Sequence, residues 1–251
     1  VSENARLDMS FIGRLSEITN VAPGSSQILR QEAALGTESA IGVGYEFSFD
    51  NRATGLNPDA GVLLRFGQDI AGLTSSMDYL KTTGLAVAER TLPRSDVTLR
   101  AVFEGGAINS LGGSTSKITE RFFLSQNQLR GFDFRGVGPR DLNVANLDAL
   151  GGNYFAVARF ETDFPLPLPD EYGISGGAFL DVGTLWGLDN TAGGPAGANA
   201  VDDQAYLRSS IGVSLFWDTP LGPLRFNFSQ PLAKRNYDDV RTFDLTVSTS
   251  F

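Results

Sequence analysis

The chain has 251 residues and a formal net charge of −9, and it contains no cysteine and no histidine. Without these two residue types the chain cannot form a Ser-His-Asp triad, a thiolate nucleophile, a disulfide or a zinc-thiolate site. The excess of negative charge also argues against a nucleic-acid-binding protein, because such proteins rely on lysine and arginine to neutralise phosphates.

Alternation of apolar and polar side chains recurs along the chain and predicts ten β-strands. In the first segment, for example, Leu7, Met9 and Phe11 alternate with polar and charged residues. The ten segments cover residues 4–15, 40–50, 60–69, 76–90, 97–104, 156–164, 174–186, 206–218, 224–229 and 243–251. Most approach the ~9–11 residues that a tilted strand needs to cross a bilayer. No helix of consequence is expected.

The two faces of these strands differ in chemistry. One face carries Phe, Leu and Val, and the other carries charged residues with many Gly and Ser. A transmembrane barrel arranges its residues in this way, with apolar side chains toward lipid and polar ones toward the lumen. A soluble all-β protein is the alternative, although its strands average only ~5–6 residues. The predicted fold class is therefore an all-β, transmembrane, antiparallel β-barrel.

Three connections are much longer than the others, at residues 16–37, 106–153 and 188–203. Short and long connections largely alternate along the chain, which places the long ones on one side of the sheet, as in outer-membrane barrels. Loops longer than ~12–15 residues are usually functional or disordered. The longest of the three is therefore the first place to look for a site.

The candidate motif in this longest loop is Arg130-Gly131-Phe132. Further glycines and a Gly-Pro pair follow it within ten residues or so, at Gly136, Gly138 and Pro139. Turn chemistry alone is an alternative explanation, because glycine and proline are the commonest turn residues. The motif gains meaning only from the strands around it.

The final segment alternates apolar residues up to the last position, with Phe243, Leu245, Val247 and Phe251 on one face. A terminal phenylalanine that closes an alternating strand is typical of bacterial outer-membrane proteins. An ordinary amphipathic strand is the alternative. The nine preceding segments favour the membrane interpretation.

Three stretches together resemble the BamA family, the barrels of the bacterial outer-membrane assembly machine. They are LRGFDFRGVGPRD (129–141), GGNYFAVARFETDFPLPLPDEYGISGGAFLDVGTLWG (151–187) and the ending from WDTPLGPLRFNFSQPLAKRNYDD to FDLTVSTSF. The resemblance implies that residues 1–251 are about ten C-terminal strands of a sixteen-stranded barrel, with the loop at about 106–153 entering the lumen. The first strands and the periplasmic POTRA domains of such proteins would then lie outside this chain.

The resemblance also implies roles for particular residues. It implies that the Arg130 loop folds into the lumen and that Arg130 meets acidic residues at Glu161 and Asp181. The alternation agrees, because it places both carboxylates on the polar face of adjacent predicted strands. Two solvated carboxylates are the alternative. The resemblance further implies a weak seam at the last strand, where client strands pair by β-augmentation.

We therefore expect an integral protein of the bacterial outer membrane that folds and inserts nascent β-barrel proteins by strand templating, without covalent chemistry. Expected partners are nascent outer-membrane proteins, assembly-machine lipoproteins, lipid and lipopolysaccharide, and no nucleic acid. No enzyme activity, catalytic residue, metal or cofactor is expected. The alternatives are a two-partner-type secretion transporter, whose superfamily shares the Arg-Gly-aromatic element, and a passive porin; a membrane-anchored hydrolase ranks last because the chain has no histidine.

Overall fold

The computed structural model describes residues 3–52, 60–72, 78–219 and 222–247. Within this part of the chain, ten long strands form one sheet. Their bounds are β1 Ala5–Ser16, β2 Glu38–Asp50, β3 Ala60–Ala71, β4 Tyr79–Thr91, β5 Thr98–Ser110, β7 Tyr154–Pro165, β8 Ile174–Trp186, β11 Arg208–Thr219, β12 Gly222–Ala233 and β14 Phe243–Val247. The short elements are α1 Gln27–Ala33, β6 Gly131–Phe132, η1 Asp170–Tyr172, β9 Ala192–Gly193, β10 Asn199–Ala200 and β13 Val240–Arg241.

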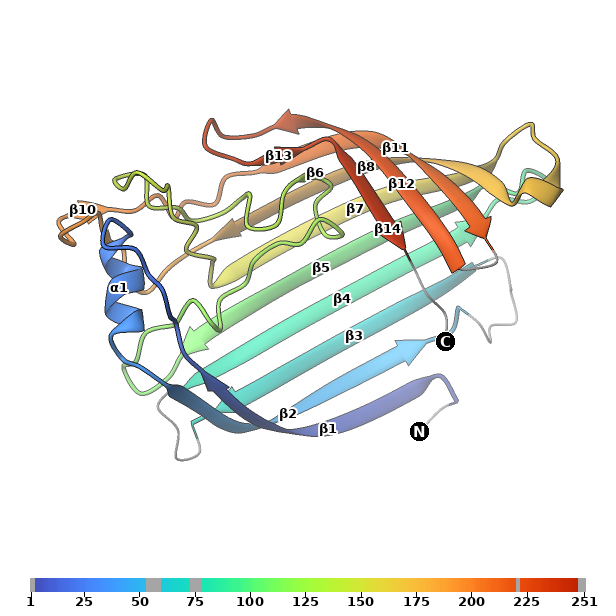
Figure 1. The fold of residues 1–251 in the computed structure, drawn as a ribbon. Coiled ribbons are helices and arrows are strands. Elements are labelled where there is room, and N and C mark those ends of the chain that lie inside the picture. Colours follow the sequence, from blue (N-terminus) through green and yellow to red (C-terminus); the bar gives the residue numbers. More distant parts are fainter. Residues whose placement is uncertain (1–2, 53–59, 73–77, 220–221, 248–251) are drawn as a thin grey trace.

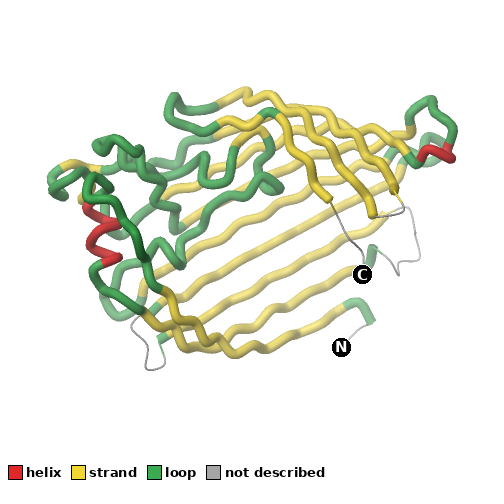
Figure 2. Tube along the Cα trace, in the orientation of Figure 1, coloured by secondary structure: helices red, strands yellow, loops and turns green. Residues whose placement is uncertain are grey.

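The long strands follow each other around the sheet in chain order, and every neighbouring pair is antiparallel. The sheet curls strongly, so that β11, β12 and β14 turn over toward the concave side (Figures 1 and 2). The prediction of ten antiparallel strands of an all-β barrel is confirmed. Most strands have 12 or 13 residues, and β5, β7 and β12 extend several residues beyond the predicted segments.

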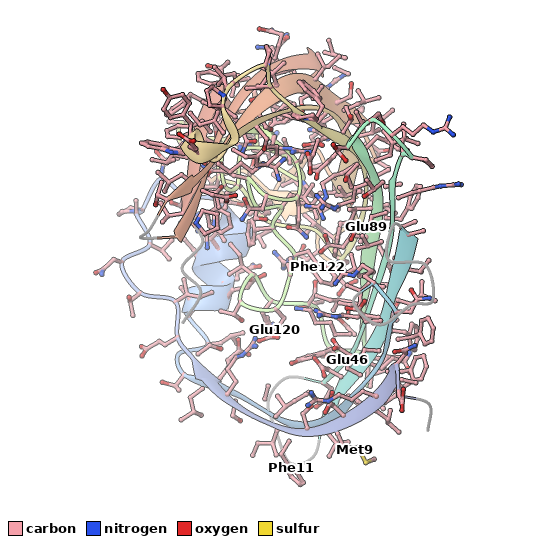
Figure 3. All side chains as sticks on the ribbon, turned by 90° about the vertical axis from the view of Figure 1, so that its right-hand side faces the viewer. Met9, Phe11, Glu46, Glu89, Glu120 and Phe122 are labelled. Carbon is pink, nitrogen blue, oxygen red and sulfur yellow. The ribbon has the colours of Figure 1, made fainter. Side chains whose placement is uncertain are left out.

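The convex face of the sheet is apolar and exposed. Met9 and Phe11 of β1 point away from the molecule in Figure 3, and their exposed fractions are 86 % and 85 %. Leu64 and Phe66 of β3 and Phe103 of β5 continue this face. Large apolar side chains that point outward from most of the strands would be unfavourable in water, whereas lipid solvates them.

The concave face is covered by residues 111–153, which we call the lumen loop. It begins later than the predicted residue 106, because β5 continues through Ser110. Glu120 and Phe122 of this loop lie inside the curved sheet (Figure 3). Its apolar residues pack against inward-facing side chains of β7 and β8, and the resulting core consists of Leu124, Leu129, Phe132, Val137, Phe155, Val157 and Leu185.

The connection between β1 and β2 contains a short helix, α1, where no helix of consequence was expected. Its first turn has no side-chain cap. Instead, the Ser26 N–H donates to the Asp148 carboxylate of the lumen loop at 2.7 Å. A seven-residue helix is too short to be stable alone, so contacts with other loops hold it, and local sequence reasoning could not find it. Among the described residues, no helix is long and apolar enough to cross a membrane.

Candidate functional site

Arg130 is buried deep in the concave side of the sheet, where the lumen loop meets the strands. Its Nε donates to Asp181 Oδ2 at 2.7 Å and its Nη2 lies 2.5 Å from Asp181 Oδ1. The backbone N–H of the same residue donates to Asp181 Oδ2 at 3.0 Å. Arg130 Nη1 lies 2.8 Å from Glu161 Oε1. The structure thus brings together the three charged residues that the sequence singled out.

Strand register explains why the two carboxylates meet one arginine. Glu161 lies on β7 and Asp181 on β8, and the register pairs Arg159 with Asp181 and Glu161 with Phe179. Because successive side chains of a strand alternate between faces, both carboxylates point to the concave side. Asp181 is fully buried. A buried carboxylate is costly without a partner, so the pair fixes the loop at one position.

Glu161 also forms ion pairs with two other arginines of the sheet. Its Oε1 lies 3.3 Å from Arg225 Nη2 of β12, and its Oε2 lies 3.2 Å from Arg100 Nη1 of β5. Arg100 in turn contacts Glu89 of β4 at 3.1 Å. The ion pairs therefore form a network across strands β4, β5, β7 and β12, and Arg130 joins the loop to that network.

Arg130 also contacts two strand residues that the sequence analysis did not single out. The Arg130 guanidinium lies over the Phe179 ring, with 3.7 Å between its Cζ and the ring centroid, a distance at which cation–π attraction operates. Ser210 Oγ of β11 donates to the Arg130 carbonyl at 2.5 Å. Their only sequence signal was an inward position on a predicted strand.

Gly131 and Phe132 continue the motif in different ways. Gly131 has φ +91°, and a Cβ there would lie 3.0 Å from Ser210 Cβ, so a larger residue would be strained. Phe132 is 2 % exposed and belongs to the apolar core between the loop and the sheet. The motif therefore combines a charged contact, a close backbone approach and an apolar anchor.

The lumen loop also pairs with the last hairpin. Gly131 and Phe132, which form β6, pair antiparallel with Arg241 and Val240 of β13. Next to this pair, the Asp133 N–H donates to the Asp239 carbonyl at 2.9 Å. The predicted motif is thus hydrogen-bonded to the segment that leads directly into the last strand.

The last described strand, β14, pairs with β12 from Leu224↔Val247 to Phe228↔Phe243. Phe243, Leu245 and Val247 point to the convex face and are about half exposed. The predicted Phe251 lies outside the described residues. These predicted seam residues do not contact the Arg130 cluster through their side chains, and they lie on the opposite face of the sheet.

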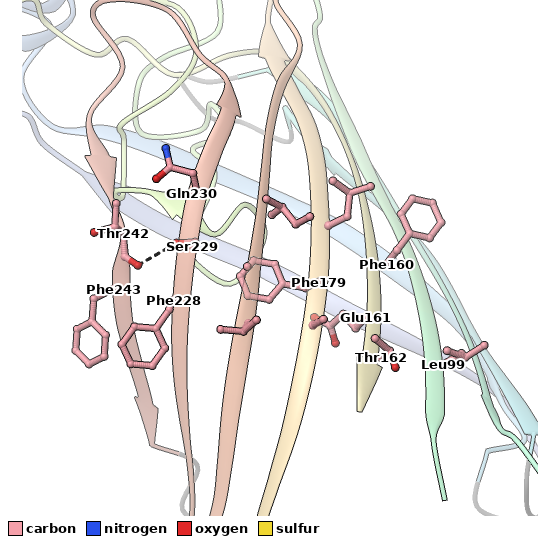
Figure 4. A pocket seen from close by; sticks show the side chains of 15 residues that line it. Leu99, Phe160, Glu161, Thr162, Phe179, Phe228, Ser229, Gln230, Thr242 and Phe243 are labelled. Atoms are coloured by element: carbon pink, nitrogen blue, oxygen red, sulfur yellow. Dashed lines mark hydrogen bonds between the residues drawn. The ribbon is translucent and has the colours of Figure 1, made fainter. Parts of the chain in front are cut away.

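A groove of about 890 Å³ opens on this convex face beside the last strands. Figure 4 shows Phe228 and Phe243 side by side at one wall and Phe160 and Leu99 at the other. Its outward side chains are largely apolar, and small residues such as Ala178 leave the space between them. An apolar groove of this kind suits lipid chains or apolar side chains.

The arrangement can position a loop against the sheet. Among the residues that the structure describes, no three or more Asp, Glu, His or Cys side chains are grouped to hold a metal ion. The charged groups of the site are paired with each other across strands. What the site can do is hold a loop and, through it, the last hairpin.

A family model for the Omp85 superfamily domain matches residues 1–251. The chain is 30 % identical, over 249 residues, to the outer membrane protein assembly factor BamA of Neorickettsia risticii (strain Illinois), a match that covers 99 % of this chain and 32 % of that protein. It is 26 % identical over 240 residues to the sorting and assembly machinery component 50 homolog A of Xenopus laevis, which covers 92 % of this chain and 49 % of that protein.

Among solved structures, the crystal structure of BamA from Haemophilus ducreyi lacking POTRA domains 1-3 has the same fold, with a TM-score of 0.70. That match has 21 % sequence identity and covers 86 % of this chain and 43 % of the other. The chain thus spans 32 % to 49 % of the length of these relatives. The resemblance to the BamA family is confirmed, and the chain belongs to the Omp85 superfamily as an integral outer-membrane β-barrel protein.

Proposed function

We propose that this chain supplies barrel strands of an outer-membrane protein assembly factor, which folds and inserts nascent β-barrel proteins. Two relatives carry names that state such a role, outer membrane protein assembly factor and sorting and assembly machinery component. Client strands would pair with the backbone of the last strand by β-augmentation. The process needs no covalent step, cofactor or metal. Nascent outer-membrane proteins, assembly lipoproteins, lipid and lipopolysaccharide are the proposed partners.

One observation carries the proposal: the lumen loop is fixed to the sheet by Arg130, Asp181 and Glu161 and is paired with the hairpin before the last strand. A loop fixed at both places keeps the last hairpin in a defined position. A strand that acts as a template needs a fixed position, because its backbone sets the register in which a client strand pairs with it.

A two-partner-type secretion transporter and a passive porin are the alternative functions. Both would use a barrel as a conduit, whereas here the lumen loop packs against β7 and β8 with a core of its own. This packing favours assembly over an open pore. Conductance of the full-length protein before and after deletion of residues 111–153 would separate a filled barrel from an open one.

Depletion of the protein in its own cells tests the proposal directly. Loss of many unrelated outer-membrane proteins is expected for an assembly factor. Loss of a single exported substrate, with the other outer-membrane proteins at normal levels, would instead identify a secretion transporter.

Complementation with Arg130→Ala tests whether the fixed loop matters. We expect reduced insertion of clients, because Asp181 loses its partner and the loop loses its position. Arg135→Ala is the matched control: Arg135 belongs to the same loop, is exposed, and its guanidinium lies over the rings of Phe123 and Phe134. Full complementation by Arg130→Ala at normal protein levels would contradict the role of the loop.

A further inference from the structure

The segment directly before β14 does not pair with β12, although the register of the last hairpin would bring the two together. Phe228 pairs with Phe243, and the Ser229 N–H donates to the Thr242 carbonyl at 2.8 Å. Continued at this register, the hairpin would place Arg241 and Val240 beside the next residues of β12. Instead, Val240 and Arg241 form β13 and pair with β6 of the lumen loop.

Pro231 weakens the competing pairing of this segment with β12. In an antiparallel ladder, alternate residues of a strand bond to the same neighbour. Because Ser229 donates toward the last hairpin, the next donor on that side would be residue 231. Proline has no backbone N–H, so β12 offers no donor at the position where Val240 would pair.

The lumen loop lies against β11 and β12 next to this gap. A Cβ on Gly131 would lie 3.0 Å from Ser210 Cβ and 3.6 Å from Pro231 Cγ, so the Gly131 backbone sits directly against β11 and β12. A side chain on residue 131 would push the loop away from this position. The glycine of the motif thus allows the loop to pair with Val240 and Arg241 while it lies close to β11 and β12.

Further contacts fix the hairpin tip around this pairing. The Asp239 N–H donates to the Gly136 carbonyl at 3.0 Å, and the Asp239 carboxylate lies 3.1 Å from Arg140 Nη2. Beside it, Asp238 and Arg208 of β11 form a buried two-point pair at 2.9 and 3.0 Å. The tip is therefore held on one side by the lumen loop and on the other by β11.

We propose that the lumen loop is the strand partner that sets where the last strand begins. Through β6 it holds Val240 and Arg241 away from β12, so that pairing of the last strand starts at Phe243. Movement of the loop would then change the pairing of the last strand. Arg241 and Gly131 are positioning residues in this arrangement. The use of the coupling in assembly rests on the function proposed above.

Arg241→Pro in the full-length protein, reconstituted in bilayers, tests the coupling. The Asp133 N–H donates to the Asp239 carbonyl, so by alternation the next bond of this pair uses the Arg241 N–H. Proline removes that donor. Arg241→Ala is the matched control, because it keeps the N–H and loses the same ion pair with Asp133, whose atoms are 3.6 Å apart.

Amide hydrogen exchange of residues 242–247 is the readout. We expect exchange about tenfold faster in Arg241→Pro than in Arg241→Ala, with strands β2 to β5 unchanged in both. Equal exchange rates of residues 242–247 in the two variants would overturn the proposal.

Pro231→Ala provides a second test, which does not depend on weakening the hairpin. It gives β12 the missing N–H, and we expect this new amide to exchange rapidly, because the loop still holds Val240. Slow exchange of the amide at residue 231 would show that Val240 returns to β12 as soon as a donor is present, and the coupling would then be wrong.

Client insertion, measured separately, distinguishes the coupling from the proposed function. If Arg241→Pro loosens the last strand and also lowers client insertion relative to Arg241→Ala, both stand. If it loosens the last strand while client insertion is unchanged, the coupling stands and its use in assembly is refuted.

Discussion

The lumen loop is attached to the barrel in two regions that differ in kind. The deep anchor consists of Arg130 with Asp181, Glu161 and Ser210, and it joins the loop to strands β7, β8 and β11. The outer anchor joins the loop to α1 and to the connection at residues 188–207. The deep anchor thus binds to a rigid sheet, whereas the outer anchor binds loops to each other.

The outer anchor contains a buried ion pair of its own. The Arg121 side chain is fully buried and contacts Glu32 of α1. The same guanidinium donates to the carbonyls of Ser116 and Leu150 at 2.6 and 3.1 Å, and Glu32 also accepts the Ile118 N–H at 2.8 Å. Burial alone therefore does not distinguish the anchors. The difference lies in what moves when each one breaks, because the deep anchor is continuous in sequence with β6, which pairs with the segment directly before the last strand.

Arg130→Ala should have the largest effect. It removes the guanidinium from two carboxylates at once, the fully buried Asp181 and Glu161, and loss of one member of a buried ion pair typically costs about 3–5 kcal/mol. Thermal unfolding of the full-length protein measures the loss of stability. Exchange of residues 242–247 should rise as well. Unchanged exchange there would remove the distinction between the two anchors, and Arg135→Ala serves again as the control.

Arg121→Ala should have a smaller and more local effect. Glu32 keeps the Ile118 N–H as a donor, so the cost should be about 1.5–3 kcal/mol, the range for hydrogen bonds to charged groups. Limited proteolysis should show faster cleavage in residues 17–37 and 111–123. Residues 242–247 should exchange as in the unmodified protein, and faster exchange there would mean that both anchors control the last strand.

Ser210→Ala tests how much the Ser210 hydroxyl contributes to the stability of the deep anchor. It removes the hydrogen bond to the Arg130 carbonyl and leaves the ion pairs in place. We expect a loss of about 0.5–1.5 kcal/mol, measured by thermal unfolding. Ser209→Ala, on the neighbouring position of the same strand, is the control. A loss of stability as large as that of Arg130→Ala would mean that the hydroxyl, rather than the charges, holds the loop in place.

The two anchors also differ in how far the sequence predicted them. Ten strands and the shared face of Glu161 and Asp181 follow from two-residue alternation, because each strand lies between two different environments. The helix α1 does not follow, because Asp148 and Arg121 hold it from far along the chain. Nor does the sequence predict that Val240 pairs away from the last hairpin. Its departure depends on a competing partner in the lumen loop, which only the three-dimensional arrangement reveals.

Acidic pH should loosen the outer anchor through Asp141, and with the smallest effect. This carboxylate is fully buried and accepts the N–H groups of Gly194 and Asn143 at 2.7 and 3.0 Å. Burial by itself would raise the pKa of Asp141, but these hydrogen bonds outweigh burial and the pKa is lowered.

A carboxyl group with a lowered pKa stabilises the folded state above its unfolded pKa of about 3.9 and loses that contribution as the pH falls through the folded value. Cleavage of residues 188–203 by an acid-active protease should therefore increase below about pH 4, and Asp141→Asn should remove this pH dependence. If the variant keeps the same pH dependence, another carboxylate controls this loop.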